Sequence, residues 1–202
     1  MKQALRDGLV FPADDDHFHG KVTEYQKAVF DMAMGYVDDI DHQCTAIDAG
    51  AHVGIFTRRM RVFSEVLAFE PDPVNYACLV ENTAMFPNVK PIHAALGRTN
   101  GWGCVQVDYQ PNSGARSFVP LNDGEIRVFP IDLFLTSPVK LIKIDTQGAE
   151  HDILLGANML LRRDKPVLIV EMPDTDTTIY LCNMGYLPVG RVNKDQVFAR
   201  RD

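Results

Sequence analysis

Short runs of apolar residues alternate with segments of helical spacing along most of the chain. Five runs predict buried strands, at residues 45–49, 65–70, 89–95, 139–145 and 166–170. Helical spacing or helix-start residues follow four of them, at residues 53–63, 71–88, 151–161 and 174–183. Strands that alternate with helices favour a largely parallel sheet with helices on both faces. We therefore expect an α/β fold with a doubly wound, Rossmann-like sheet.

The remaining segments extend this core. The apolar spacing of residues 22–36 predicts a helix over 21–38, after a polar, irregular stretch at 1–20. Residues 98–130 alternate at period two around turn sequences, which predicts a small β-hairpin excursion near the functional site. We expect a single domain over residues 1–202. Its parts are an N-terminal loop and helix (1–43), the core (45–172), and a closing helix and hairpin (173–202).

Composition narrows the class of protein. The chain has 202 residues, 46% of them hydrophobic, which is enough for the core of one domain. Its net charge of −7 argues against a nucleic-acid partner, and no apolar run approaches the ~20 residues of a membrane span. Residues 1–8 lack the apolar core of a signal peptide, and the four cysteines form no C-x-x-C pair. We therefore expect a cytoplasmic protein with free thiols.

Metal-binding residue types gather near the N-terminus, at Asp14, Asp15, Asp16, His17 and His19. A metal site needs a rigid element that fixes the geometry of its ligands, and the pattern predicts none in this stretch. We expect a solvated loop and no metal site.

The strand at 45–49 leads into a glycine turn of the form D-x-G-x-x-x-G, made by Asp48, Gly50 and Gly54. A turn from a strand into a helix leaves free backbone N–H groups at the helix start, where an anionic or carboxylate-bearing ligand can bind. The next strand ends in Glu70 and Pro71, and an acid at that place can bind ribose hydroxyls. Together the two features predict a site for a nucleoside cofactor.

His52 indicates which nucleoside cofactor the turn favours. The dinucleotide fingerprint G-x-G-x-x-G needs its middle glycine so that a pyrophosphate can approach the backbone, and His52 stands at that place here. An imidazole obstructs a pyrophosphate. It does not obstruct S-adenosylmethionine (SAM), whose methionine end carries only a small carboxylate and an amine. The residues therefore favour SAM over NAD.

Several stretches together resemble the FkbM family of SAM-dependent methyltransferases. They are residues 47–54, 69–71, 95–97 and 142–150, with the strand that ends in Glu171, and the resemblance spans residues 45–172. It implies a class I methyltransferase sheet of seven strands, mostly parallel, in the order 3-2-1-4-5-7-6. It also implies transfer of a methyl group, usually to a hydroxyl. The family more often has Asn where His52 stands, and Val-Glu where Thr146 and Gln147 stand.

The candidate site residues follow from the sheet topology. In a doubly wound sheet the ligand lies beyond the carboxyl ends of the strands, where the strand order reverses. That place is between the strands ending at Asp48 and Asp145. We expect the cofactor to contact Asp48, Gly50, Ala51, His52, Val53, Gly54, Glu70, Pro71, Ala95, Leu96 and Asp145. The candidate bases for a hydroxyl acceptor are Asp145, Glu150 and Glu171.

Structural roles compete with some of these assignments. Asp48 could simply cap the backbone N–H groups of its own turn. Glu150 could simply favour the first turn of its helix, and Glu171 could bind the loop that follows it. Tyr25 could touch the cofactor, but its place in an apolar stripe favours packing in the core.

The function that these residues predict is SAM-dependent O-methylation of a hydroxyl on a sugar or another small-molecule or glycan acceptor. Two other classes stay open. An NAD-linked oxidoreductase is disfavoured by His52 and by the lack of a recognisable hydride-site motif. A non-catalytic SAM-binding protein stays possible because Gln147 replaces an acid of the family pattern.

Overall fold

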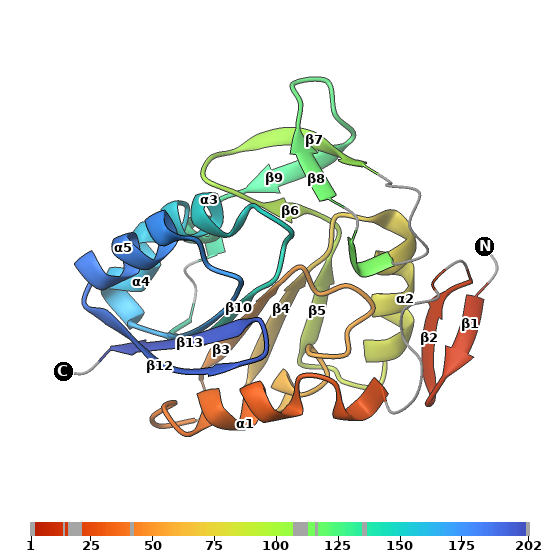
Figure 1. The fold of residues 1–202 in the computed structure, drawn as a ribbon. Helices are drawn as coiled ribbons and strands as arrows, with labels where there is room; N and C mark the ends of the chain where they lie inside the picture. Colours follow the sequence, from red (N-terminus) through yellow and green to blue (C-terminus); the bar gives the residue numbers. More distant parts are fainter. Residues whose placement is uncertain are drawn as a thin grey trace.

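A seven-stranded sheet forms the centre of the molecule (Figure 1). The computed structural model describes residues 3–13, 15, 22–40, 43–106, 113–115, 117–134 and 137–200. The strands of the sheet are β3 (Thr45–Ala49), β4 (Glu65–Phe69), β5 (Val89–Ile92), β10 (Val139–Ile144), β11 (Val167–Glu171), β12 (Tyr186–Val192) and β13 (Asp195–Arg200). Their order, read from β5, is β5-β4-β3-β10-β11-β13-β12. This is the strand order that the family resemblance implied.

The sheet is mixed rather than wholly parallel. The strands from β5 to β11 pair in parallel, whereas β13 runs antiparallel to both β11 and β12. The strand order reverses between β3 and β10, where Asp48 pairs with Lys143 and Ala49 with Ile144. The carboxyl ends of these two strands therefore flank the place where doubly wound sheets bind ligands.

Helices cover both faces of the sheet because its strands are apolar on both sides. The helices are α1 (Lys27–Met34), α2 (Pro73–Thr83), α3 (Glu150–Leu155), α4 (Asn158–Asp164) and α5 (Thr175–Asn183). Ile47 and Ile142 belong to the core cluster that includes α3, α4 and α5, whereas their neighbours Ala46 and Leu141 belong to the cluster that includes α1. Successive strand residues point to opposite faces, so one strand supplies both clusters.

A second sheet of four strands lies at the top of Figure 1. Its strands are β6 (Ala95–Leu96), β7 (Gly101–Gln106), β8 (Ser117–Pro120) and β9 (Ile126–Phe129), in the order β6-β9-β7-β8. The excursion predicted as a hairpin is therefore larger, and the single strand predicted over 89–95 is wrong. The chain turns after Ile92, where Ala94 N donates to Ile92 O, and β6 then pairs with β9 instead. Residues 107–112 and 116 of the predicted excursion lie outside the described residues.

The helix predicted over 53–63 is also wrong, because these residues form turns and a short 3-10 helix, η2 (Met60–Val62). Gly54 has a φ of +89°, and a Cβ there would lie 2.8 Å from Leu79 Cδ1 on α2. The hydrogen bonds that follow mix two spacings, from Arg58 N to Gly54 O and from Arg59 N to Phe56 O. Close packing against α2 thus prevails over the apolar spacing of the sequence.

Two other predicted helices are interrupted. In place of one helix over 21–38, the 3-10 helix η1 (Val22–Glu24) precedes α1, and Gln26 separates them with a φ of +55°. Tyr25 lies in this connection, 42% exposed, so its predicted packing in the core is wrong. Residues 151–161 are divided between α3 and α4 by Gly156, where a Cβ would lie 2.1 Å from Gly97 O.

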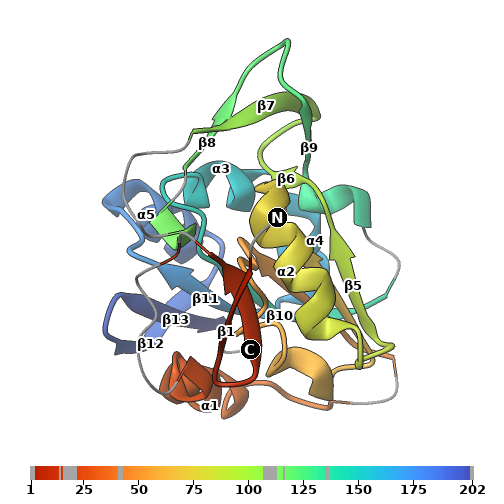
Figure 2. The same ribbon diagram turned by 90° about the vertical axis from the view of Figure 1, so that its right-hand side faces the viewer.

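An N-terminal hairpin, β1 (Gln3–Arg6) and β2 (Leu9–Pro12), replaces part of the predicted irregular stretch. Leu9 and Phe11 are buried in a cluster with Val53 and Cys78. Figure 2 shows the hairpin beside α2. Asp15, predicted in a solvated loop, is only 2% exposed, whereas Asp14 and residues 16–20 lie outside the described residues.

Two predictions about the class of protein concern membrane-spanning segments and the state of the cysteines. Within the described residues, no helix combines the length and the apolar character that crossing a membrane requires. The cysteines are all free thiols: Cys44, Cys78, Cys104 and Cys182.

Candidate functional site

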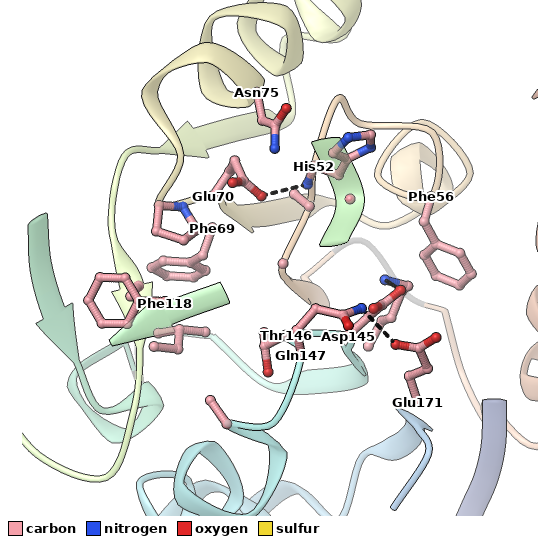
Figure 3. Close-up of a pocket in the computed structure, with 18 of the residues that line it drawn as sticks. His52, Phe56, Phe69, Glu70, Asn75, Phe118, Asp145, Thr146, Gln147 and Glu171 are labelled. Carbon is pink, nitrogen blue, oxygen red and sulfur yellow. Dashed lines mark hydrogen bonds and ion pairs between the residues drawn. The ribbon is translucent and has the colours of Figure 1, made fainter. Parts of the chain in front are cut away.

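A pocket opens at the carboxyl ends of β3, β4 and β10 (Figure 3). Its volume of about 270 Å³ is close to the lower limit of the ~300–1,000 Å³ typical of small-molecule sites. Figure 3 shows Glu70 and Asn75 at one end and Asp145 and Glu171 at the other. We refer to these as the Glu70 end and the Asp145 end.

The glycine turn after β3 brings two strand ends together instead of opening an anion site. Gly50 has a φ of +78°, and a Cβ there would lie 1.9 Å from Asp145 O. The N–H groups of Gly50 and Ala51 both donate to Phe69 O, at 3.0 and 2.9 Å, and Gly54 N donates to Ala51 O. The predicted free N–H groups are therefore wrong at these three residues. The N–H groups of these three residues are therefore not available to an anionic ligand.

Glu70 is buried and already holds two backbone groups. Its Oε2 accepts from His52 N and its Oε1 from Asp72 N, both at 2.8 Å. Burial raises the pKa of Glu70 to about 7, although these hydrogen bonds oppose the shift. Each carboxylate oxygen can accept a second hydrogen bond, so Glu70 can also bind a pair of ligand hydroxyls.

Asn75 and an apolar wall complete the Glu70 end. Asn75 Nδ2 donates to Ser113 O at 3.0 Å, and its buried Oδ1 has no hydrogen-bond partner within the part of the chain that the structure describes. Phe69 and Phe118 line the adjacent wall (Figure 3), and the apolar Leu96 is a further lining residue of the pocket. An acidic corner beside an apolar, aromatic wall suits a nucleoside.

His52 also lines the pocket, on the other side of Glu70 from Phe69 and Phe118 (Figure 3). Its φ is +52°, and its Nε2 lies 2.6 Å from Ser113 Oγ. Burial lowers the pKa of His52 to about 4, although the nearby carboxylates of Asp15 and Asp145 oppose the shift. The imidazole is therefore neutral at neutral pH and offers no positive charge to a phosphate group.

At the Asp145 end, a buried lysine holds two carboxylates. Lys143 Nζ lies 3.0 Å from Asp145 Oδ2 and 3.8 Å from Asp48 Oδ1. Burial alone would lower the pKa of Lys143, but these two carboxylates more than offset it and the pKa lies above its ordinary value. Gln26 Nε2 also donates to Asp145 Oδ2, at 3.4 Å. Asp145 is thus held as an anion by two donors.

Glu171 forms a pair with Asp145 through a hydrogen bond between their side chains. Burial and this neighbouring anion raise the pKa of Glu171, whereas Lys143 brings the pKa of Asp145 below its ordinary value despite burial. Gln147 Nε2 donates to Glu171 Oε2 at 3.3 Å (Figure 3). Of the two carboxyl groups, Glu171 therefore holds a proton more tightly than Asp145.

The pocket brings together most of the residues that the sequence predicted for the site. The predicted residues that line it are Gly50, Ala51, His52, Glu70, Pro71, Ala95, Leu96, Asp145 and Glu171. All of them except Ala95 and Leu96, which form β6 of the second sheet, lie at the carboxyl ends of adjacent strands of the central sheet or directly after them, which is why the positions of strand ends could predict them.

Four predicted residues do not line the pocket. Asp48 is fully buried and accepts from Thr57 Oγ1 at 2.6 Å. Val53 packs in the cluster under the N-terminal hairpin, and Gly54 packs against Leu79. Glu150 Oε1 accepts from Thr146 N and Gly148 N, both at 3.1 Å, so its carboxylate holds the loop after β10. In this structure these four residues therefore lie outside the lining of the pocket, and their predicted roles stay predictions.

Several lining residues were missed. They are Gln26, Ile55, Phe56, Phe69, Asn75, Ala94, Ser113, Gly114, Phe118, Lys143, Thr146, Gln147, Ala149 and Lys194. Tyr25, for which contact with the cofactor was only the alternative, also lines the pocket. Lys143 could have been predicted, because it is a charged residue inside an apolar strand. Ser113 and Gln26 lie in segments whose pattern carries no such sign.

The comparisons with known proteins agree with one another. The family model described as the methyltransferase FkbM domain matches residues 48–188. A methyltransferase FkbM from Methylobacillus flagellatus has a similar structure, with a TM-score of 0.57 and 20% sequence identity. That match covers 78% of this chain and 44% of the other, so this chain spans less than half of that protein. No curated protein matches the sequence significantly.

Two further structures share the fold at lower identity. A precorrin 8w decarboxylase from Methanobacterium thermoautotrophicum has a TM-score of 0.56 at 12% identity, over 98% of this chain and 100% of that one. A 16S rRNA N2 G1207 methyltransferase from T. thermophilus, in complex with AdoMet and guanosine, has a TM-score of 0.52 at 13% identity. This match covers 99% of this chain and 50% of that one.

Proposed function

Because the chain belongs to the FkbM family of methyltransferases, we propose that it transfers a methyl group from SAM to a hydroxyl oxygen of a sugar or another small-molecule or glycan acceptor. The observation that carries this proposal is the pocket with two different ends. Glu70 at one end is placed to hold a ribose, and the Asp145–Glu171 pair at the other is placed to receive a proton.

The donor groups of the pocket fit SAM better than a dinucleotide. A pyrophosphate needs N–H groups or cations, but Gly50, Ala51 and His52 use their backbone N–H groups within the protein. Asp145, which is held as an anion, repels a diphosphate and attracts a sulfonium or an ammonium group, and Glu70 does the same when it is ionised. These contacts argue against the NAD-linked alternative.

We assign the Glu70 end to the adenosine part of SAM. Glu70 would accept the ribose hydroxyls, and the apolar side chains of Phe69, Leu96 and Phe118 would take the adenine. Asp145 would face the ammonium of the methionine part. When bound, SAM supplies an electrophilic methyl group.

The remaining chemistry belongs to side chains of this chain. Pocket walls that orient the acceptor hydroxyl toward the methyl group account for much of the rate enhancement of an in-line transfer. The acceptor must also lose its proton, and a positioned carboxylate contributes typically ~10²–10⁴-fold to such a step. Glu171, in the fraction of molecules where it is ionised, takes the proton on an oxygen next to Asp145. Lys143 keeps Asp145 anionic, and this negative charge strengthens Glu171 as a base.

Calorimetry with SAM, S-adenosylhomocysteine (SAH) and NAD⁺ tests the cofactor. We expect SAM and SAH to bind and NAD⁺ not to bind, and tight binding of NAD⁺ alone would reverse the assignment. Formation of SAH from SAM with a panel of sugars and polyols then tests the reaction. Binding without turnover on any hydroxylated acceptor would favour the non-catalytic SAM-binding alternative.

The cellular setting is part of the same proposal. Four free thiols are typical of a reducing compartment, so we propose a cytoplasmic location. The net charge of −7 favours a small-molecule or glycan acceptor over a nucleic acid.

A further inference from the structure

Ser113 is held in the pocket wall by hydrogen bonds to three separate parts of the chain. Its N donates to Asp15 Oδ2 at 3.0 Å, and its Oγ bonds the same carboxylate oxygen. Its carbonyl accepts from Asn75 Nδ2, and His52 Nε2 lies 2.6 Å from its Oγ. Ser113 is only 3% exposed, so these bonds are made away from solvent.

The direction of each bond in this Asp15–Ser113–His52 chain can be worked out. Burial would raise the pKa of Asp15, but hydrogen bonds from Ser113 and Arg6 bring it below its ordinary value. Asp15 is therefore an anion that can only accept, so the hydroxyl hydrogen of Ser113 points to it. Ser113 Oγ must then accept from His52, which fixes the proton of the neutral imidazole on Nε2.

The N-terminal hairpin holds Asp15 in place. Arg6 Nη1 lies 2.8 Å from Asp15 Oδ1, and its guanidinium stacks over the ring of Phe11. Asn82 on α2 pairs with both backbone groups of Val10, at 2.7 and 2.8 Å. A segment that precedes the family match at 48–188 thus reaches the pocket through fixed contacts.

His52 connects this chain to the acid at the Glu70 end. Its side chain bonds Ser113, while its backbone N donates to Glu70 Oε2 at 2.8 Å. The left-handed backbone of His52 allows both contacts from one residue. A change at Ser113 therefore reaches Glu70 through two hydrogen bonds, and a change at Asp15 through three.

We propose that Asp15 and Ser113 are positioning residues of the adenosine subsite, through which the N-terminal hairpin sets the geometry of His52 and Glu70 around the nucleoside. This inference rests on the proposed function, since it needs an adenosine-bearing ligand at the Glu70 end. It assigns a binding role to a segment that neither the sequence pattern nor the family match includes.

A purely structural role would have different consequences. If the Asp15–Ser113–His52 hydrogen bonds only held the hairpin against the rest of the protein, loss of these bonds would lower the stability of the protein. The affinity of the folded protein for nucleosides would then be unchanged. A positioning role links the stability of these contacts to the affinity for nucleosides, because a ligand that requires the ordered pocket wall must also stabilise that wall.

Calorimetry of SAH and 5′-methylthioadenosine, which lacks the amino-acid part, separates these roles. Asp15→Asn and Ser113→Ala should each weaken both ligands about tenfold, as expected for loss of one hydrogen bond to a charged group. The double variant should bind about as weakly as the weaker single variant, because both changes break the same contact. Asp31→Asn, at an exposed ion pair with Lys27 on α1, is the matched control and should bind like wild type.

Hydrogen exchange gives a second readout, which includes the wild type. SAH should slow amide exchange over residues 3–13 in the wild type, and Ser113→Ala should remove this protection. The inference is overturned if both single variants, measured as folded protein, bind both ligands within twofold of wild type. It is equally overturned if SAH binds the wild type without slowing exchange over residues 3–13. Failure of the wild type to bind SAH would instead contradict the proposed function.

Discussion

Lys143 Nζ lies 3.0 Å from the carboxylate of Asp145, two residues further along the chain at the end of β10. The parallel register with β3 adds Asp48, whose Oδ1 is 3.8 Å from the same nitrogen. The side chain of Lys143 is 3% exposed, and a buried ammonium is tolerated only beside anions. The ammonium of Lys143 thus compensates the negative charges of Asp145 and Asp48 at the place where the strand order of the sheet reverses.

Lys143→Met should lower the free energy of unfolding by about 3–5 kcal/mol, because removing one partner of a buried ion cluster leaves the other charges uncompensated. Urea denaturation followed by circular dichroism measures the change. Lys140→Met, on the same strand at a partly exposed position, is the control and should cost less than ~1 kcal/mol. Equal stability of the two variants would show that Lys143 does not hold the carboxylates.

Glu171→Gln should reduce methyl transfer by about 10²–10⁴-fold while leaving the affinity for SAH within threefold, because the amide cannot take a proton. Steady-state formation of SAH and calorimetry measure the two quantities. Glu150→Gln keeps an acceptor oxygen for Thr146 N and Gly148 N, so it should retain most of the activity. If the Glu150 variant loses as much activity as the Glu171 variant, the assigned base is wrong.

Glu70→Gln should raise the Kd for SAH by about 10–100-fold, since an amide replaces charged hydrogen bonds to the ribose, which contribute ~1.5–3 kcal/mol. Calorimetry at neutral pH measures the change, and the exposed Glu81→Gln on α2 serves as its control. An unchanged Kd for the Glu70 variant would place the ribose elsewhere.

The stability of the unliganded protein should fall as the pH rises from 6.5 to 8. The pKa of Glu70 is raised to about 7 and that of Glu171 to about 8. An acid with a raised pKa contributes stability that is fully present below its unfolded pKa of ~4.5 and is lost as the pH rises through its folded pKa. His52, whose pKa is lowered to about 4, acts in the opposite direction, but only up to about pH 6.5.

Urea denaturation at constant ionic strength over this range measures the fall. Glu171→Gln should flatten the curve above pH 7, because the amide cannot titrate, and Glu81→Gln should not change it. A free energy of unfolding that increases between pH 6.5 and 8 in the wild type would contradict the raised pKa values.

Gly50→Ala should destabilise the protein by more than about 2 kcal/mol, since its Cβ would meet Asp145 O at 1.9 Å and its φ is +78°. Gly101→Ala, at a glycine in β7 with open space around its Cβ position, should stay within ~0.5 kcal/mol of wild type. Thermal or urea denaturation compares them. A Gly50 variant as stable as the Gly101 variant would refute the close approach of the two strands.

The pattern of the sequence was sufficient where a feature depends on neighbouring residues. The apolar runs located β3, β4, β10 and β11, because a strand buried on both faces must be apolar almost throughout. The acids directly after such runs then had to lie at one edge of a parallel sheet. That reasoning placed Glu70, Asp145 and Glu171 in one pocket.

Tertiary contacts decided the features that the pattern could not predict. The glycine turn uses its N–H groups on Phe69 O and Ala51 O, which depends on how closely β3 and β4 end together. Asp48 and Glu150 lie next to strand or helix ends like the other acids, but their partners at Thr57 and Thr146 turn them away from the pocket.

By itself, the sequence determined the alternation of strands and helices, the glycine turn and the acids at the strand ends, because each follows from spacing within one segment. Only the tertiary structure decided which of those acids reach the pocket and that Asp15 bonds Ser113, a residue 98 positions away. The physical reason is that a hydrogen bond depends on distance in space, and hydrophobic periodicity specifies which face of an element is buried but not which distant polar group it will meet.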